Sequence, residues 1–132
     1  MWLPDTNVWI ALLNASPTPV TERFRARNPA QIFLCDVVKM ELYYDAFRSV
    51  RIERNSSVLD RLFATFHSLP FDGAAARACG EVRATLAGTG MPIGPYDSQI
   101  AAIALVNRVT LVTHNVREFG RVPNLTVEDW AL

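Results

Sequence analysis

The chain has 132 residues, half of them hydrophobic and a fifth charged, and its formal net charge at pH 7 is zero. This length suits one domain, expected to span residues 1–132, and the zero net charge argues against binding of nucleic acid through bulk charge alone. No apolar run approaches the roughly 20 residues of a membrane span, and the first residues show no signal-peptide pattern. The two cysteines, Cys35 and Cys79, suit buried thiols in a reducing compartment. We therefore expect a cytoplasmic protein that does not contact a membrane.

Strands and helices are predicted to alternate through the first half of the chain. Thr or Asp before an apolar run marks the start of a helix, and a short apolar run between polar residues marks a buried strand. In chain order we expect a strand ending at Asp5, a helix over residues 8–13 capped by Asp5 or Thr6, a helix from Thr18 and Pro19 to about Asn28, a strand at Ile32–Cys35, and a helix capped by Asp36 that runs past Glu41 to about Arg54.

The same alternation continues in the second half. We expect a helix opening at Asn55 or Ser57, a brief strand at 69–71, a helix over 74–87 capped by Asp72 and ended by Gly88 and Gly90, a stiff loop at 91–95, a strongly apolar helix at 97–106, a strand at 109–113 and a last strand at 125–127. This order of elements is typical of an α/β fold with a mostly parallel central sheet.

Polar side chains from four distant segments are predicted to meet at one edge of that sheet. Ligands of open parallel sheets bind beyond the carboxyl ends of the strands. Asp5 ends the first strand, Asn115 follows the strand at 109–113, and Asp97 lies in the first turn of a helix that begins at this edge. Glu41 lies about 7.5 Å along the helix that begins at Asp36. These four residues are the candidate site.

Glu41 carries the most information among them, because it lies within an apolar stripe of its helix. An unpaired charge in such a place costs several kcal/mol, so the residue needs a partner. No lysine is near, and the other well-placed polar groups are mostly carboxylates, which repel each other unless a cation is bound or protons are shared. An all-oxygen site of this kind suits Mg²⁺ or Mn²⁺ rather than zinc or copper.

Each candidate also has a purely structural explanation. Asp5 could only cap the following helix, and Asp97 could only complement a helix dipole. Glu41 could pair with an arginine, and Asn115 could occupy a left-handed loop position. Their conjunction at one edge favours a functional site. The two histidines have no partner at metal-ligand spacing, and we find neither a glycine-rich phosphate loop nor a nucleophile elbow.

Five segments carry a recognisable pattern in a fixed order along the chain. They are Asp5-Thr6-Asn7-Val8, Glu41-Leu42-Tyr43-Tyr44, Pro92-Ile93-Gly94-Pro95-Tyr96-Asp97 followed by Ile100-Ala101-Ala102, Leu111-Val112-Thr113-His114-Asn115-Val116-Arg117-Glu118-Phe119, and Val122-Pro123-Asn124-Leu125 with Trp130. These motifs resemble those of PIN-domain proteins, particularly the VapC-type toxins of VapBC toxin–antitoxin pairs, and the likeness covers nearly the whole chain.

The resemblance implies a single PIN domain, with helices on both faces of the sheet, and an endoribonuclease (a hydrolase) that needs Mg²⁺ or Mn²⁺. It also implies an RNA substrate, a homodimer and inhibition by a cognate VapB-type antitoxin. Asp5, Glu41 and Asp97 match the acidic residues that hold the metal in the family. Asn115 matches a fourth position that is often Asp, which puts a full second metal site in doubt. Pro4 stands where an aliphatic residue is usual.

The resulting hypothesis is metal-assisted hydrolysis of an RNA phosphodiester. Asp5, Glu41 and Asp97 hold the cation, and Asn115 positions a water. Arg48, seven residues beyond Glu41, is a candidate phosphate contact, although an ion pair would also explain it.

Two alternatives stay open. A phosphohydrolase could use Asp5 as a covalent nucleophile, but such enzymes want a second Asp where this chain has Asn7. A non-catalytic PIN-like module that binds RNA or protein is the other alternative, and the presence of all three acids argues against it.

Overall fold

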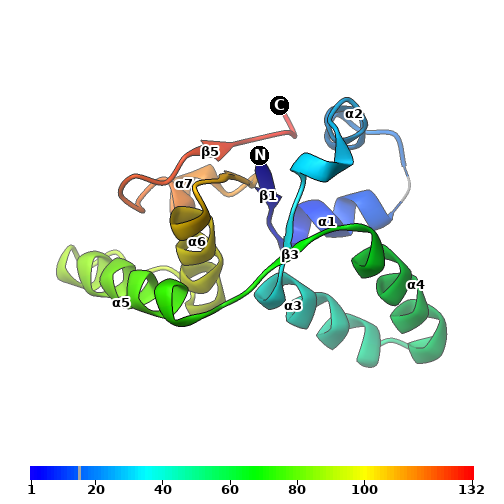
Figure 1. Ribbon diagram of the computed structural model, residues 1–132, viewed down its shortest axis with the longest axis horizontal. Helices are drawn as coiled ribbons and strands as arrows, with labels where there is room; N and C mark the ends of the chain where they lie inside the picture. The colour runs from blue at the N-terminus through cyan, green and yellow to red at the C-terminus, as the bar shows by residue number, and fades with distance from the viewer. Residues whose placement is uncertain (15) are drawn as a thin grey trace.

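Parallel strands form the centre of the molecule (Figure 1). The computed structural model describes residues 1–14 and 16–132. Within them, the strands are β1 (Trp2–Pro4), β2 (Leu34–Cys35), β3 (Ser68–Leu69), β4 (Thr110–Val112) and β5 (Val127–Glu128). β1, β4 and β5 form one sheet in that order, and β2 pairs with β3. A bridge between Trp2 and Ile32, with Phe33 N donating to Trp2 O at 2.9 Å, joins the two groups. Every pairing is parallel, which confirms the predicted sheet.

Helices pack around the strands. In Figure 1, α5 and α6 lie on one side of the strands, and α1, α3 and α4 lie on the other. The helices are α1 (Thr6–Leu13), α2 (Pro19–Arg25), the 3-10 helix η1 (Pro29–Gln31), α3 (Asp36–Phe47), α4 (Ile52–Thr65), α5 (Gly73–Gly88), α6 (Pro95–Asn107) and α7 (Val116–Phe119). Over the described residues, no helix combines the length and apolarity that crossing a bilayer requires.

Three helices begin at the caps that the sequence predicts. Asp5 accepts a hydrogen bond from Val8 N at 3.1 Å, and Asp72 accepts one from Ala75 N at 3.0 Å. Thr18 caps α2 through a reciprocal pair with Thr21, in which each side-chain oxygen accepts from the other residue's backbone N–H. Each cap satisfies backbone donors that the first turn of a helix leaves free.

The predicted helix from Asp36 to Arg54 is wrong, because it breaks after Phe47. Ser49 Oγ donates to Ala46 O at 2.6 Å and accepts from Asn55 Nδ2 at 2.8 Å, so side chains replace the helical hydrogen bonds at this turn. The next helix, α4, starts at Ile52, before either predicted start.

Asp36 also does not cap α3. Its carboxylate accepts from Ser68 Oγ at 3.1 Å, and Cys35 occupies the cap position without a side-chain hydrogen bond.

Two further elements differ from the prediction. α2 ends at Arg25 rather than Asn28, since Asn28 precedes Pro29 and adopts an extended conformation. The one-turn helix α7 was not predicted. It has only four residues, too few to show a helical period in the sequence.

The buried core holds the carboxyl edge of the sheet in place. The α6 segment Ile100–Ala104 is buried almost completely, as are Leu3 and Leu111 of the adjacent strands β1 and β4. On the other side, Trp9 of α1 has no exposed surface, and its ring packs edge-on against Phe66. Packing of this density restricts movement of the strand ends that carry the candidate site.

The cap of α2 offers a test of the fold. We expect Thr18→Ala to lower the free energy of unfolding by about 1 kcal/mol, because it removes one hydrogen bond of the reciprocal pair at the helix start. Urea unfolding followed by circular dichroism measures this difference. Thr126→Ala, at an exposed position, is the matched control and should change stability by less than about 0.5 kcal/mol. Equal stability of the two variants would contradict the capping role.

Candidate active site

A cavity of about 550 Å³ brings the three predicted acidic residues together. Asp5 follows β1, Glu41 projects from α3, and Asp97 lies in the first turn of α6. The other lining residues are Thr6, Asn7, Ile10, Met40, Tyr44, Asp45 and Tyr96. Asp5 and Glu41 are 36 residues apart in sequence, and Glu41 and Asp97 are 56 residues apart. They nevertheless line the same cavity, because parallel strands end at the same edge of the sheet.

Asp5 is the most buried of the three acids, with 7% of its surface exposed. Burial raises the pKa of the Asp5 carboxyl, and the nearby Glu41 adds to this effect. Hydrogen bonds from the Thr113 hydroxyl and the Val8 amide act in the opposite direction on that pKa, since they stabilise the carboxylate. Asp5 therefore caps α1 and also lines the cavity, so its role as a cap leaves it available as a candidate site residue.

Glu41 is held by a hydroxyl rather than by an arginine. Thr6 Oγ1 donates to Glu41 Oε1 at 2.6 Å, across 35 residues of sequence. Within the described part of the chain, the only side-chain ion pairs are Arg27 with Glu128 and His114 with Asp129. The explanation of Glu41 by an arginine partner is therefore wrong for these residues, and its charge is directed to the cavity.

Asp97 lies beside a fourth acid, Glu118 of α7. Burial and the charge and hydrogen bond of Glu118 raise the pKa of Asp97 to about 7, with smaller contributions from Glu41 and Asp5. The Glu118 carboxylate also accepts a hydrogen bond from the backbone, because Gly94 N donates to Glu118 Oε1 at 3.1 Å. The loop before α6 and the helix α7 are thereby joined at the site, where Glu118 also forms a hydrogen bond with Asp97.

Asn115 does not line the cavity and contacts it only through other residues. Its Nδ2 donates to Glu118 Oε2 at 2.5 Å, and its backbone N donates to Thr113 Oγ1 at 3.0 Å. The side chain is exposed and is not part of the cavity lining, and its φ of −86° is not left-handed. Asn115 thus contacts two residues, Thr113 and Glu118, that themselves contact Asp5 and Asp97.

Arg48 caps the carboxyl end of α3 and is exposed. Its Nη1 donates to the Tyr44 hydroxyl at 3.1 Å, and its guanidinium carbon lies 5.2 Å from the centre of the Tyr44 ring. Tyr44 lines the cavity, so Arg48 reaches the site through this ring.

Sequence reasoning missed Thr6, Thr113 and Glu118. The spacing Asn115-x-x-Glu118 offered a signal, since a short polar residue followed by Glu three positions later is typical of a helix start. No local signal marked Thr6 or Thr113, whose partners Glu41 and Asp5 are distant in sequence.

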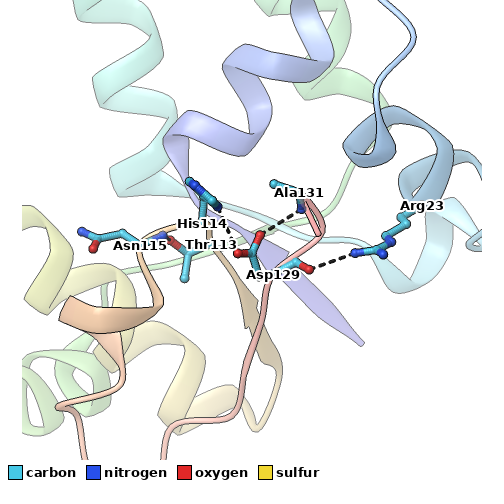
Figure 2. A network of polar contacts seen from close by, with 6 residues as sticks. All are labelled: Arg23, Thr113, His114, Asn115, Asp129 and Ala131. Carbon is cyan, nitrogen blue, oxygen red and sulfur yellow. Dashed lines mark hydrogen bonds and ion pairs between the residues drawn. The ribbon is translucent and has the colours of Figure 1, made fainter.

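A network behind the site fixes the turn that carries Thr113 and Asn115 (Figure 2). His114 Nδ1 lies 3.0 Å from Asp129 Oδ2, and Arg23 Nη1 donates to Asp129 O at 2.9 Å. Asn115 is directed away from Asp129 in this view. The segment after β5 therefore connects α2 to the turn after β4.

The cavity offers only oxygen donors among its charged groups, and these suit a hard divalent cation. Among the described residues, no three acidic, histidine or cysteine side chains are already grouped tightly enough to surround one ion. The carboxylates line the same cavity but do not form a compact set of ligands around one point. Mutual repulsion keeps such groups apart until a positive charge or a proton lies between them.

The raised pKa of Asp97 makes the stability of the cation-free protein depend on pH. This carboxyl ionises near pH 3.8 in an unfolded chain and, because of burial and Glu118, near pH 7 in the folded one. Folding is therefore increasingly opposed as pH rises from about 4 to about 7. We expect Asp97→Asn to melt with the wild type near pH 4.5 and about 2–8 °C above it at pH 8 in chelator.

Glu81→Gln, at an exposed position of α5, is the control and should follow the wild type at both pH values. Circular dichroism melting curves measure the difference, and identical curves for Asp97→Asn and wild type at pH 8 would contradict the burial of a repelled charge.

Known proteins are similar to this chain in sequence and in fold. The family model for the PIN domain matches residues 2–125. The tRNA(fMet)-specific endonuclease VapC of Shigella flexneri is 40% identical over 127 residues, or 96% of each chain. Ribonuclease VapC2 of Rickettsia felis is 33% identical over 98% of each chain.

Solved structures agree. In the crystal structure of DNA-bound VapBC from Salmonella typhimurium, one chain superposes with a TM-score of 0.90 and 37% identity, over 98% of this chain and 97% of that one. VapBC-1 from nontypeable Haemophilus influenzae gives a TM-score of 0.90 and 30% identity, over 99% and 98% of the two chains. The chain therefore belongs to the PIN-domain family and, within it, to the VapC ribonucleases.

Proposed function

We propose that this protein is an endoribonuclease that uses Mg²⁺ or Mn²⁺ to hydrolyse RNA phosphodiester bonds, and that it acts as the toxin of a type II toxin–antitoxin pair. The observation that carries the proposal is the sharing of one cavity by Asp5, Glu41 and Asp97. Ribonucleases with this domain generally depend on a divalent metal, and the all-oxygen cavity fits such an ion. A bound divalent cation supplies charge neutralisation at the phosphate and acidifies a coordinated water.

The side chains have distinct roles in this proposal. Asp5, Glu41 and Asp97 bind the cation. Thr113 orients the Asp5 carboxylate, and Thr6 orients the Glu41 carboxylate. Glu118 forms a hydrogen bond with Asp97 and so helps to position that carboxyl group. Asn115 orients Glu118, which extends its role beyond the predicted positioning of water. Arg48 remains the candidate phosphate contact at the rim.

Transfer RNA is the first substrate to test. Two relatives, from Shigella flexneri and Salmonella typhimurium, are named tRNA(fMet)-specific endonucleases and are 40% and 38% identical to this chain over 96% of its length. The net charge of zero means that recognition depends on local shape and contacts rather than on bulk attraction.

A VapB-type antitoxin is the proposed inhibitor, since the superposed Salmonella and Haemophilus chains come from VapBC complexes. The acidic cavity suits a cationic side chain of such a partner, which would occupy the place of the metal. We also propose a homodimer, in the cytoplasm.

The two alternatives predict different chemistry. A non-catalytic module would be stabilised by the cation or by RNA without cleaving it. A phosphohydrolase using Asp5 would form a phospho-aspartate that can be trapped. The presence of Asp5, Glu41 and Asp97 in one cavity, with Glu118 beside Asp97, favours the nuclease.

Cleavage of RNA by the purified protein tests the proposal. We expect cuts in a transfer RNA pool, including initiator tRNA, with Mg²⁺ or Mn²⁺ and none in EDTA. Asp5→Asn should reduce the rate by at least about 100-fold, because it removes one of the charges that bind the cation. End mapping on a gel measures the cleavage.

Asp60→Asn, an exposed position on α4, is the matched control and should keep the wild-type rate. Activity of Asp5→Asn, or of the wild type in EDTA, at the level of the untreated enzyme would overturn the metal-dependent mechanism.

A further inference from the structure

Two tyrosine rings stand exposed at the acidic cavity. Tyr44 has 57% of its surface exposed and Tyr96 has 47%, and both line the cavity that holds Asp5, Glu41 and Asp97. Each ring lies beside a cavity carboxylate on its own helix. Tyr44 comes three residues after Glu41, on the same face of α3, and Tyr96 directly precedes Asp97 in α6.

The third tyrosine of the chain shows what a structural tyrosine looks like in this fold. Tyr43 packs edge-on against Phe63 at 5.0 Å, and its hydroxyl donates to Asp60. No aromatic pair involves Tyr44 or Tyr96 among the described residues. Two of the three tyrosines thus expose part of their rings at the cavity that holds Asp5, Glu41 and Asp97.

Arg48 fixes one of these rings. Its guanidinium carbon lies 5.2 Å from the centre of the Tyr44 ring, and its Nη1 donates to the Tyr44 hydroxyl at 3.1 Å. A cation on one face and a hydrogen bond at the hydroxyl hold the ring in one orientation. The exposed part of the ring is available to a planar ligand, and little side-chain entropy is lost when such a ligand stacks there.

Electrostatics explains why an RNA-cleaving site would need such rings. The cavity presents carboxylates, which repel the phosphates on both sides of the cleaved bond, and one cation neutralises only its own surroundings. The net charge of zero supplies no compensating attraction. Stacking of a base on an aromatic ring does not depend on charge and tolerates every base.

We propose that Tyr44, held by Arg48, and Tyr96 are stacking platforms for two unpaired nucleobases that flank the cleaved phosphate. This inference rests on the ribonuclease function proposed above. The bases must leave their helical stack to reach the rings, so the site takes single-stranded loops and excludes paired stems.

The experiment combines protein variants with RNA that lacks single bases. The substrate is a short RNA hairpin that carries the mapped cleavage site in its loop, together with copies that have an abasic ribose on the 5′ or the 3′ side of the cut. We expect Tyr44→Ala and Tyr96→Ala each to raise KM by about 5- to 150-fold, the range that loss of one base–aromatic stack gives, with a smaller change in kcat. Tyr44→Phe and Tyr96→Phe, which keep the ring, should raise KM less than the corresponding alanine variants do.

The abasic substrates give the decisive comparison. Removing the base that stacks on Tyr44 should raise the wild-type KM as much as Tyr44→Ala does, and the Tyr44→Ala variant should then be insensitive to that base. The same relation should hold between Tyr96 and the base on the other side. Additive losses for every pairing of variant and abasic position would overturn the proposal.

Failure of this inference can be told apart from failure of the proposed function. A wild-type protein that cleaves no RNA overturns the ribonuclease function itself. A wild type that cleaves, with both alanine variants at the wild-type KM but with weakened binding of a VapB-type antitoxin, overturns the stacking role alone and assigns the rings to a protein interface. Melting curves of all four variants establish that each is folded.

Discussion

The fold raises the pKa of two carboxyl groups, Asp5 and Asp97, and so disfavours their charged forms. Burial is the main cause for Asp5, and burial together with Glu118 is the cause for Asp97. This effect follows from the topology, because the residues that follow parallel strands lie together at one edge of the sheet. Several polar contacts near this edge stabilise the carboxylates that lie there. Thr113 and Val8 stabilise the Asp5 carboxylate, and Thr6 holds Glu41. Ionisation of these carboxyl groups is thus costly in the cation-free protein, and the proposed divalent cation would offset that cost.

Much of the site could be predicted from the sequence because its residues follow from local rules. Asp5 lies where a short apolar strand gives way to a helix, and Asp97 lies in the first turn of a helix that starts at the same edge. Placing these segments in a parallel sheet is sufficient to bring them together. Thr18 and Asp72 were predicted correctly as caps for the same reason, since a cap depends on residues within three positions.

The elements that were missed depend on contacts across the chain or on very short segments. The break after Phe47 depends on hydrogen bonds of the Ser49 side chain with Ala46 and Asn55, which no apolar periodicity reveals. Glu118 lies in a single helical turn, and its importance comes from Gly94 and Asp97, more than 20 residues away. Asn115 was placed correctly beside the site, but its side chain contacts Glu118 rather than the cavity.

The segment after β5 has a consequence for where this protein can be shortened. Arg27 lies between the rings of Trp2 and Trp130, 4.8 and 4.5 Å from their centres, and Asp129 contacts His114 beside Thr113. The stretch that matches the family ends at residue 125, before all of these contacts from residues 127–131. A chain ending at residue 125 would keep every acidic residue of the cavity. It would lose Trp130, which packs near Trp2 and Arg27, and the contact of Asp129 with His114 in the turn after β4. The folded unit therefore extends beyond the stretch that the family model matches, and residues 127–131 support the turn that carries Thr113.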